Sequence, residues 1–183
     1  MRRLGPMIGA IAALQLSACA GTEPVADMAP APDGLRMVVT DLRDAAGQIR
    51  ARATAEQVGD SIRVRVESIR MTQGAYGAHV HMTGRCDAPG FTTAGGHWNP
   101  TAQQHGKDNP QGMHKGDLPN LLVGTDGRGS FEYTIPNATI AGNGPNVMLD
   151  QDGAAVVVHQ SADDFRTDPS GNSGARIACG VVG

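Results

Sequence analysis

The six histidines are the residues of this chain whose type and spacing could do chemistry. They are His79, His81, His97, His105, His114 and His159. His79 and His81 are two residues apart, so in an extended strand both imidazoles point to the same face, as two ligands of one metal ion require. Imidazole nitrogens suit copper and zinc. The pattern therefore predicts a metal centre.

A second group of candidate ligands follows in a glycine-rich segment. It consists of His97, His105, His114 and Asp117, with the carboxylate three residues after the last histidine of the segment. Such a segment could fold around a second ion. A lone histidine is usually solvated or hydrogen bonded, so the prediction depends on the combination and not on any single residue.

The elements that must hold these ligands are predicted to be strands. Ile62, Val64 and Val66 alternate with charged residues, which is the period of a half-buried strand. Residues 49–53 and 131–135 repeat this alternation, and residues 156–158 form a short buried strand. Turn residues separate the strands, at Ala46-Gly47, Gly59-Asp60, Asp126-Gly127 and Asp152-Gly153. Because helical periodicity is absent after the N-terminal segment, we predict an all-β sandwich or barrel.

Two long segments do not fit the strand pattern. Residues 84–120 and 160–174 are rich in Gly, Pro, Asn, Asp and His. Loops of this length without regular structure are uncommon in compact domains unless they are functional or disordered. They hold most of the candidate ligands, so function is the better interpretation.

The N-terminus is predicted to direct export. Arg2 and Arg3 precede a mostly apolar run over residues 4–16, which is too short to span a bilayer comfortably. The ending Leu16-Ser-Ala-Cys19 resembles the lipobox of bacterial lipoproteins. We therefore expect a signal peptide over 1–18, a lipidated Cys19 followed by a flexible tether to residue 34, and a folded domain over 35–183. The alternative is an ordinary cleavable signal with an incidental cysteine.

The cysteine content agrees with export, and the net charge argues against one class of partner. Without residues 1–18 the chain has 13 basic and 18 acidic residues, a net charge of −5, which argues against a nucleic-acid partner. Cys86 and Cys179 then remain as one pair, and a disulfide is the default in an oxidising compartment. Two buried free thiols, the alternative, would fit a cytosolic protein better.

Four segments resemble the bacterial branch of the copper,zinc superoxide dismutase family. They are Gly77-Ala-His-Val-His81, Ala94-Gly-Gly-His-Trp-Asn-Pro100, Gly116-Asp-Leu-Pro-Asn120 and Gly174-Ala-Arg-Ile-Ala-Cys-Gly-Val181. The similarity runs from about residue 36 to the C-terminus. It implies an all-β Greek-key β-barrel or sandwich of about eight antiparallel strands with two long functional loops, and one copper and one zinc per subunit.

The resemblance also implies roles for individual residues. Copper would be bound by His79, His81, His97 and His159. Zinc would be bound by His97, His105, His114 and Asp117, so that His97 bridges the two ions. Asp163 would link His79 to His105, although it could also be a solvated acid. Arg176 would guide the anionic substrate, unless it is a surface salt-bridge partner. Cys86 and Cys179 would form the intrasubunit disulfide.

The implied activity is conversion of superoxide to dioxygen and hydrogen peroxide by Cu(II)/Cu(I) cycling. His97 would leave the reduced copper and carry a proton, and Lys107 and Lys115 are further candidates for attracting substrate. One alternative is a non-catalytic copper-binding dismutase-like lipoprotein of the envelope. Another is a structural β-sandwich in which the histidines are incidental.

The expected location is the periplasm-facing cell envelope, with the membrane reached through Cys19. Ala20 is not the acidic residue often linked to inner-membrane retention, which favours the outer membrane. The sequence leaves monomer and homodimer both open. Tyr76, Ala78 and Met82 depart from the family pattern beside the first two histidines, so we predict looser packing of segment 76–82.

Overall fold

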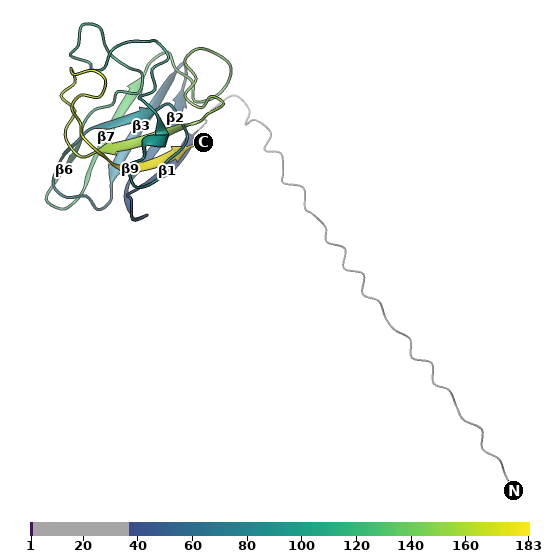
Figure 1. Cartoon of the computed structure of the whole chain (residues 1–183). Helices are drawn as coiled ribbons and strands as arrows, with labels where there is room; N and C mark the ends of the chain where they lie inside the picture. Colours follow the sequence, from purple (N-terminus) through teal and green to yellow (C-terminus); the bar gives the residue numbers. More distant parts are fainter. Residues whose placement is uncertain (2–36) are drawn as a thin grey trace. The chain divides into compact units, whose positions relative to one another are not determined.

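The computed structural model describes Met1 and residues 37–183, and the chain folds there into nine strands and one short 3₁₀ helix (Figure 1). The elements are β1 (Met37–Arg43), β2 (Ile49–Val58), β3 (Ser61–Ser68), β4 (Gly74–Tyr76), β5 (Ala78–His81), η1 (Thr92–Ala94), β6 (Leu121–Val123), β7 (Gly129–Ile135), β8 (Ala154–His159) and β9 (Arg176–Val182). The predicted signal peptide, Cys19 and the tether lie outside the described part of the chain.

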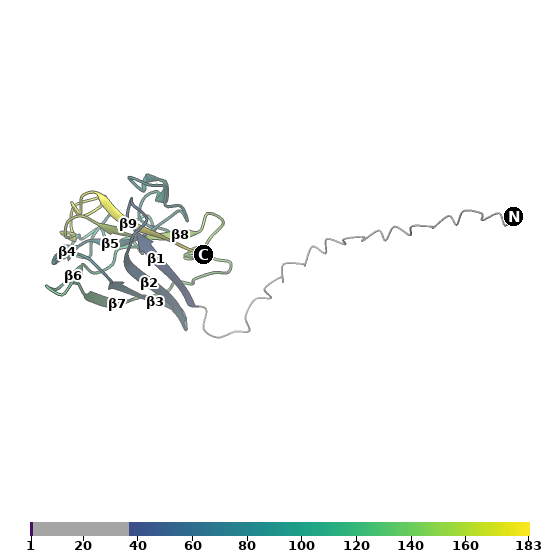
Figure 2. The same ribbon diagram turned by 90° about the horizontal axis from the view of Figure 1, so that it is seen from below.

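Seven strands form one curled antiparallel sheet in the order β5-β8-β9-β1-β2-β3-β7. Strands β4 and β6 pair with each other, and β6 packs against β7 and β3 (Figure 2). The order is not sequential, because the chain crosses between distant strands from β3 to β5, from β5 to β7 and from β7 to β8. The predicted all-β barrel is confirmed, with nine short strands where about eight were expected.

The barrel interior is filled by the alternating apolar residues of its strands. Ala51, Ala53 and Ala55 of β2 and Ile62, Val64 and Val66 of β3 are buried in this core, as the period of two predicts.

Strand β8 is buried on both faces. Val156 and Val158 join the barrel core, whereas Ala155 and Val157 point outward and pack with Phe91, Ala94 and Cys179 in a second buried cluster.

The outward face of β8 is also the face that carries the first two histidines. In the β5–β8 ladder His79 pairs with Val157 and His81 with Ala155, and cross-strand partners lie on the same side of a sheet. Ala78 and Val80, which alternate with the histidines, enter the barrel core. The imidazoles therefore lie outside the barrel, beneath the loops.

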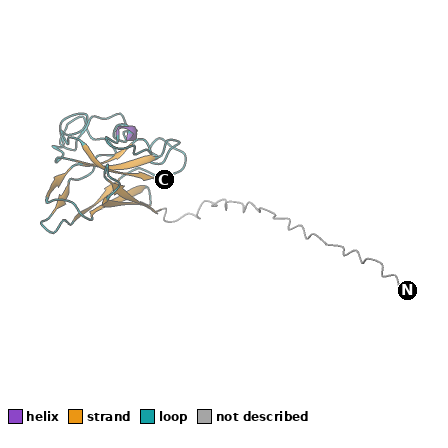
Figure 3. Cartoon of the chain, turned by 60° about the horizontal axis from the view of Figure 1, so that its bottom comes forward, coloured by secondary structure: helices purple, strands orange, loops and turns teal. Residues whose placement is uncertain are grey.

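The two long loops follow β5 and β8. Figure 3 shows loops gathered around the short helix at one end of the strands. Residues 82–120 contain only η1 as a regular element, and residues 160–175 contain none. Backbone and side-chain bonds join the loops, among them Asp108 N–H to the Phe165 carbonyl at 3.0 Å. Within the described residues, no helix has the length and apolar character needed to cross a membrane.

The expectation of a loose segment 76–82 is wrong. Strand β4 pairs with β6 and β5 pairs with β8, and the Gly77 N–H donates to the Ser161 carbonyl at 2.8 Å. On the other edge of β5, the Val80 N–H donates to the Gly116 carbonyl at 2.9 Å. Ala78 is fully buried. Backbone pairing on both edges orders the strand, whatever the size of the side chain at position 78.

Candidate metal centre

Four buried imidazoles converge on one point. One ring nitrogen from each of His79, His81, His97 and His159 lies within 4.8 Å of the others. Among the described residues, the buried side-chain atoms without a hydrogen-bond partner are His79 Nδ1, His81 Nε2, His97 Nε2 and His159 Nε2. A buried polar atom without a partner is costly, and a metal ion would satisfy all four at once. Nitrogen donors of this kind suit copper.

The opposite nitrogens of three of these rings are hydrogen bonded. The contacts are His79 Nε2 to Asp163 Oδ2 at 2.7 Å, His81 Nδ1 to the Gly95 carbonyl at 3.0 Å, and His159 Nδ1 to the Gly174 carbonyl at 3.1 Å. A ring nitrogen that faces a carbonyl or carboxylate must carry the proton, so the lone pair is left on the nitrogen that faces the common point. The surrounding acceptors therefore select the tautomers that can bind a metal.

Burial keeps these imidazoles neutral. It lowers the pKa of His79 to about 3 and that of His159 to about 4. The pKa of His81 and that of His97 are also lowered, chiefly by burial. Because desolvation disfavours the imidazolium, all four rings present lone pairs at neutral pH.

A second group of donors surrounds one carboxylate oxygen. Asp117 Oδ1 lies 3.0 Å from His97 Nδ1, 2.9 Å from His105 Nδ1 and 3.2 Å from His114 Nδ1. A tetrahedral zinc with ligands at about 2.0–2.2 Å separates its donors by roughly 3.3–3.6 Å, so slight expansion of this cluster would admit the ion. Three imidazoles and one carboxylate are a ligand set for a closed zinc site.

Asp117 is held as a carboxylate. Its other oxygen accepts the backbone N–H groups of Gly106 at 2.9 Å and His114 at 3.0 Å. Burial would raise the pKa of Asp117, but the hydrogen bonds to His105, His114 and His97 outweigh it and hold the pKa far below its usual range.

His97 belongs to both groups. Its Nδ1 faces Asp117 and lies 3.4 Å from His114 Nδ1, whereas its Nε2 is one of the four unpartnered atoms. Its ring also stacks on that of His79, with centroids 3.9 Å apart. One imidazole therefore presents a nitrogen to each of two neighbouring points, which is the geometry that a bridging ligand needs.

Asp163 connects the two groups through their outer nitrogens. Its oxygens lie 2.7 Å from His79 Nε2 and 3.0 Å from His105 Nε2, so it is no solvated acid. Burial alone would lower the pKa of His105, but the hydrogen bonds to Asp117 and Asp163 raise it to about 9.

Two residues that hold Asp163 in place were not predicted from the sequence. The side-chain amide of Asn120 donates to the Asp163 carbonyl at 2.9 Å and accepts the Asp163 N–H at 2.8 Å. Gly171 has φ of +63°, and a Cβ there would overlap Asp163 Oδ1 and crowd His105 Nε2. Neither role has a local signal, although Asn120 ends one of the segments that carry the resemblance.

A β-bulge places Arg176 beside the four-histidine group. In the β8–β9 ladder Val158 pairs with Ala178 but His159 pairs with Arg176, so Ile177 has no opposite residue. Without this irregularity Ile177 would oppose His159. The extra residue therefore brings the arginine to the face that carries the imidazoles.

Arg176 is fixed by the long loop that follows β5. Its Nη1 donates to the Phe91 carbonyl and its Nη2 to the Gly95 carbonyl, both at 2.7 Å. Both acceptors are neutral carbonyls, so they do not neutralise the positive charge of the guanidinium. Its remaining N–H groups can donate to an anion. This contradicts the alternative of a surface salt-bridge partner, since no ion pair of Arg176 occurs in the described residues.

The disulfide Cys86–Cys179 ties the loop that follows β5 to strand β9.

Lys107 and Lys115 have partners of their own. Lys107 Nζ contacts Asp108 at 3.0 Å and lies 4.5 Å from the centre of the Phe165 ring, and Lys115 Nζ donates to the Pro136 carbonyl at 2.6 Å. Neither ammonium group is positioned by a contact to the histidine groups.

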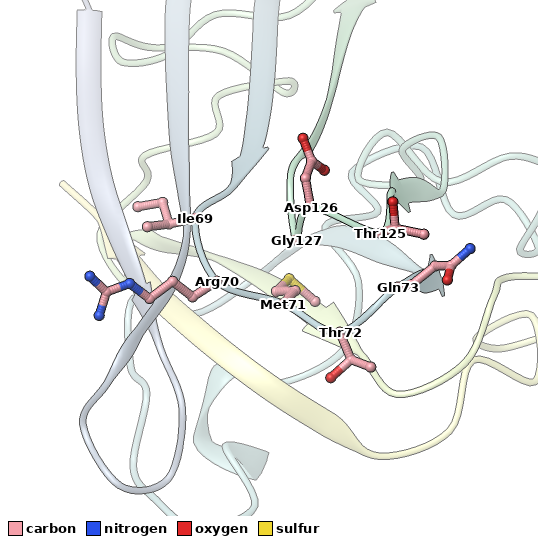
Figure 4. A pocket seen from close by; sticks show the side chains of 8 residues that line it. All are labelled: Ile69, Arg70, Met71, Thr72, Gln73, Thr125, Asp126 and Gly127. Atoms are coloured by element: carbon pink, nitrogen blue, oxygen red, sulfur yellow. The ribbon is translucent and has the colours of Figure 1, made fainter.

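Two surface grooves differ in their relation to the site. An open groove of about 690 Å³ is formed by residues 69–73 and 125–127 and includes none of the candidate ligands (Figure 4). Another, of about 450 Å³, has His97, Trp98, Asn99 and Met82 in its wall. The second groove thus brings solvent to the neighbourhood of the shared imidazole.

Comparison with known proteins agrees with this geometry. The family model described as "Copper/zinc superoxide dismutase (SODC)" matches residues 45–182. The chain belongs to the copper/zinc superoxide dismutase family. Superoxide dismutase [Cu-Zn] 1 of Aquifex aeolicus (strain VF5) is 37% identical over 143 residues, which cover 78% of this chain and 85% of that protein. The family resemblance carried by the sequence motifs is confirmed.

A second type of family member is also similar. The superoxide dismutase-like protein YojM of Bacillus subtilis (strain 168) is 41% identical over 128 residues, which cover 70% of this chain and 65% of that protein. The crystal structure of a double mutant of a SOD-like protein from Bacillus subtilis, in which tyrosine and proline were replaced by histidine, superposes with a TM-score of 0.74. The two sequences are 37% identical, and the match covers 79% of this chain and 95% of the Bacillus subtilis chain. The family therefore contains proteins named as dismutases and proteins named only as dismutase-like.

Proposed function

We propose that this protein is a copper- and zinc-dependent superoxide dismutase. The observation that carries the proposal is the set of four unpartnered nitrogens facing one point, one of them on the imidazole that also faces Asp117. His79, His81, His97 and His159 would hold copper. His97, His105, His114 and Asp117 would hold zinc. Family membership supports both metals.

Copper bound by these four nitrogens would supply the one-electron exchange by which one superoxide is oxidised to dioxygen and a second is reduced to hydrogen peroxide. The chain contributes the remaining functions. Arg176, fixed by two carbonyls, attracts the anion and orients it beside the imidazoles. When His97 Nε2 is not bound to copper, it would hold one of the two protons that peroxide formation consumes. Asp163 and the loop carbonyls keep the other imidazoles in their metal-binding tautomers.

The alternative is a dismutase-like protein that binds copper without turnover. The similarity to YojM supports this candidate. The seven donor residues and Arg176 favour the enzyme, because a copper carrier needs neither a bridging imidazole nor a fixed cation beside the metal. Superoxide turnover separates the two candidates, since both bind copper.

The test is superoxide turnover by the purified protein, measured as isolated, after copper removal by a chelator, and after reconstitution with copper and zinc. We expect activity to disappear with copper and to return with it. A reconstituted protein that contains both metals but does not accelerate dismutation would refute the enzyme and leave the copper-binding alternative. A protein that binds neither metal would refute both.

We also propose that Cys19 is lipidated and anchors the domain to a membrane of the bacterial envelope, on its periplasmic side. Of the two membranes, we favour the outer one. Two features support lipidation: residues 1–18 resemble an export signal, and that signal ends in a lipobox-like sequence before Cys19. Mass spectrometry of the membrane-extracted protein should find an N-terminal peptide that begins with acylated Cys19. The control is the C19A variant, which we expect in the soluble periplasmic fraction. Wild-type protein found only in that soluble fraction would contradict anchoring.

A further inference from the structure

The outer ring nitrogens of the candidate ligands reveal one histidine that differs from the others. A metal-binding histidine almost always donates its other ring N–H to a carboxylate, a carbonyl or water. His79, His81, His105 and His159 have such an acceptor within 3.1 Å, and His97 uses both nitrogens in the two donor groups. His114 has its Nδ1 toward Asp117, and its Nε2 lies 3.9 Å from Asp168 Oδ1.

The same oxygen of Asp168 has a second, short contact in the zinc group. The backbone N–H of His105 donates to Asp168 Oδ1 at 2.6 Å. Asp168 belongs to the loop after β8, whereas both histidines belong to the loop after β5. A single carboxylate oxygen therefore touches the backbone of one candidate zinc ligand and faces the outer nitrogen of another.

The separation from His114 can close with little movement. A direct N–H to carboxylate bond is about 2.7–3.2 Å, roughly 1 Å shorter than the present distance. His114 is almost buried, with 7% of its side chain exposed, whereas the Asp168 side chain is 47% exposed and has room to move. A cation at His114 Nδ1 makes the N–H on Nε2 a stronger donor, which favours this closure.

We propose that Asp168 is a positioning residue of the zinc group. It fixes His105 through the backbone, accepts the Nε2–H of His114 when zinc is bound, and thereby joins the two long loops at the metal. This inference rests on the proposed zinc site. It gives the zinc group two outer carboxylates, Asp163 on His105 and Asp168 on His114, both from the loop after β8.

The test compares zinc affinity in Asp168→Ala, Asp168→Asn and a charge-matched control, Asp108→Asn. The side chain of Asp108 pairs with Lys107 at the surface, so its substitution removes the same charge from the same region without touching a ligand. Zinc dissociation constants are measured by competition with a chelator. We expect Asp168→Ala to weaken zinc binding about 10–100-fold and Asp168→Asn by less, because the amide oxygen still accepts the His105 N–H. The control should stay within about twofold of wild type.

Two further measurements separate positioning from general loop stability. Thermal unfolding of zinc-free and zinc-loaded protein should show a smaller zinc-induced rise in Tm for Asp168→Ala than for wild type, whereas a purely structural role would lower both forms equally. Cobalt(II) substituted for zinc should give a ligand-field spectrum altered in the Asp168 variants and unaltered in the control.

The inference is overturned if both Asp168 variants bind zinc as wild type does, or if the zinc-induced rise in Tm is unchanged. Should Asp168→Ala fail to fold, Asp168→Asn decides through its zinc affinity and cobalt spectrum. If the wild-type protein binds zinc and consumes superoxide, and both Asp168 variants match its zinc affinity, only the role of Asp168 is refuted. A wild-type protein without zinc refutes the proposed function itself.

Discussion

Replacement of Asn120 by alanine should damage the metal centre without removing a ligand. The amide of Asn120 satisfies both the N–H and the carbonyl of Asp163, and Asp163 is 3% exposed. Leaving a buried polar group without its partner costs about 1–3 kcal/mol, so loss of the two bonds should cost roughly 2–6 kcal/mol in the free energy of unfolding. For a domain of this size that corresponds to a fall in Tm of roughly 6–19 °C.

The damage should extend to both donor groups, because Asp163 contacts His79 and His105. The assay is thermal unfolding together with copper and zinc affinities, with Asn146→Ala as the control. Asn146 makes one exposed bond to the Asn137 carbonyl and none to the site, so its loss should cost little. An Asn120→Ala protein with wild-type Tm and wild-type affinities would refute the view that this amide holds Asp163 in place.

Three further predictions concern attraction of the anion by Arg176, crowding of Asp163 and stability in acid. Arg176→Gln should keep both metals but lower the rate of dismutation about tenfold or more and flatten its dependence on ionic strength; an unchanged rate would remove the arginine from the mechanism. Gly171→Ala should weaken copper and zinc binding, whereas Gly47→Ala, which carries the same left-handed strain with open space around it, should lower Tm only slightly; equal metal affinities in the two variants would contradict crowding of Asp163. In the metal-free protein the pKa of His79, about 3, and that of His159, about 4, lie below the ordinary 6.5, so the unfolded chain takes up more protons and Tm should fall between pH 6.5 and about 4; an unchanged Tm in that range would contradict burial of neutral rings.

Local alternation was sufficient to predict the strands with one clearly apolar face. Strands β2, β3 and β7 show it over six or more residues, and β8 is a continuous apolar run. Strand β1 mixes exposed and half-buried residues, and β4 and β6 are three residues long, so periodicity could not reveal them.

The candidate ligands were predictable because the imidazoles are few and their spacing is distinctive. The residues that orient them were less accessible to sequence reasoning. Asn120 and Asp168 act across a contact between two loops, which depends on the fold and leaves no periodic signal. The bulge at Ile177 depends on how two strands pair, and it decides which side chain faces His159.

In the proposed enzyme, the carbonyl of Gly95 would couple copper binding to capture of the substrate. It accepts the Nδ1–H of His81 at 3.0 Å and the Nη2–H of Arg176 at 2.7 Å, so one peptide group sets the orientation of an imidazole and of the guanidinium. The segment that contains Gly95 is held by Phe91 and Ala94, which pack on the outer face of β8, and by the disulfide Cys86–Cys179. A displacement of this segment must therefore move His81 and Arg176 together. Perturbations of the loop that never touch a ligand should impair copper affinity and anion attraction in parallel, because both side chains donate to the same carbonyl.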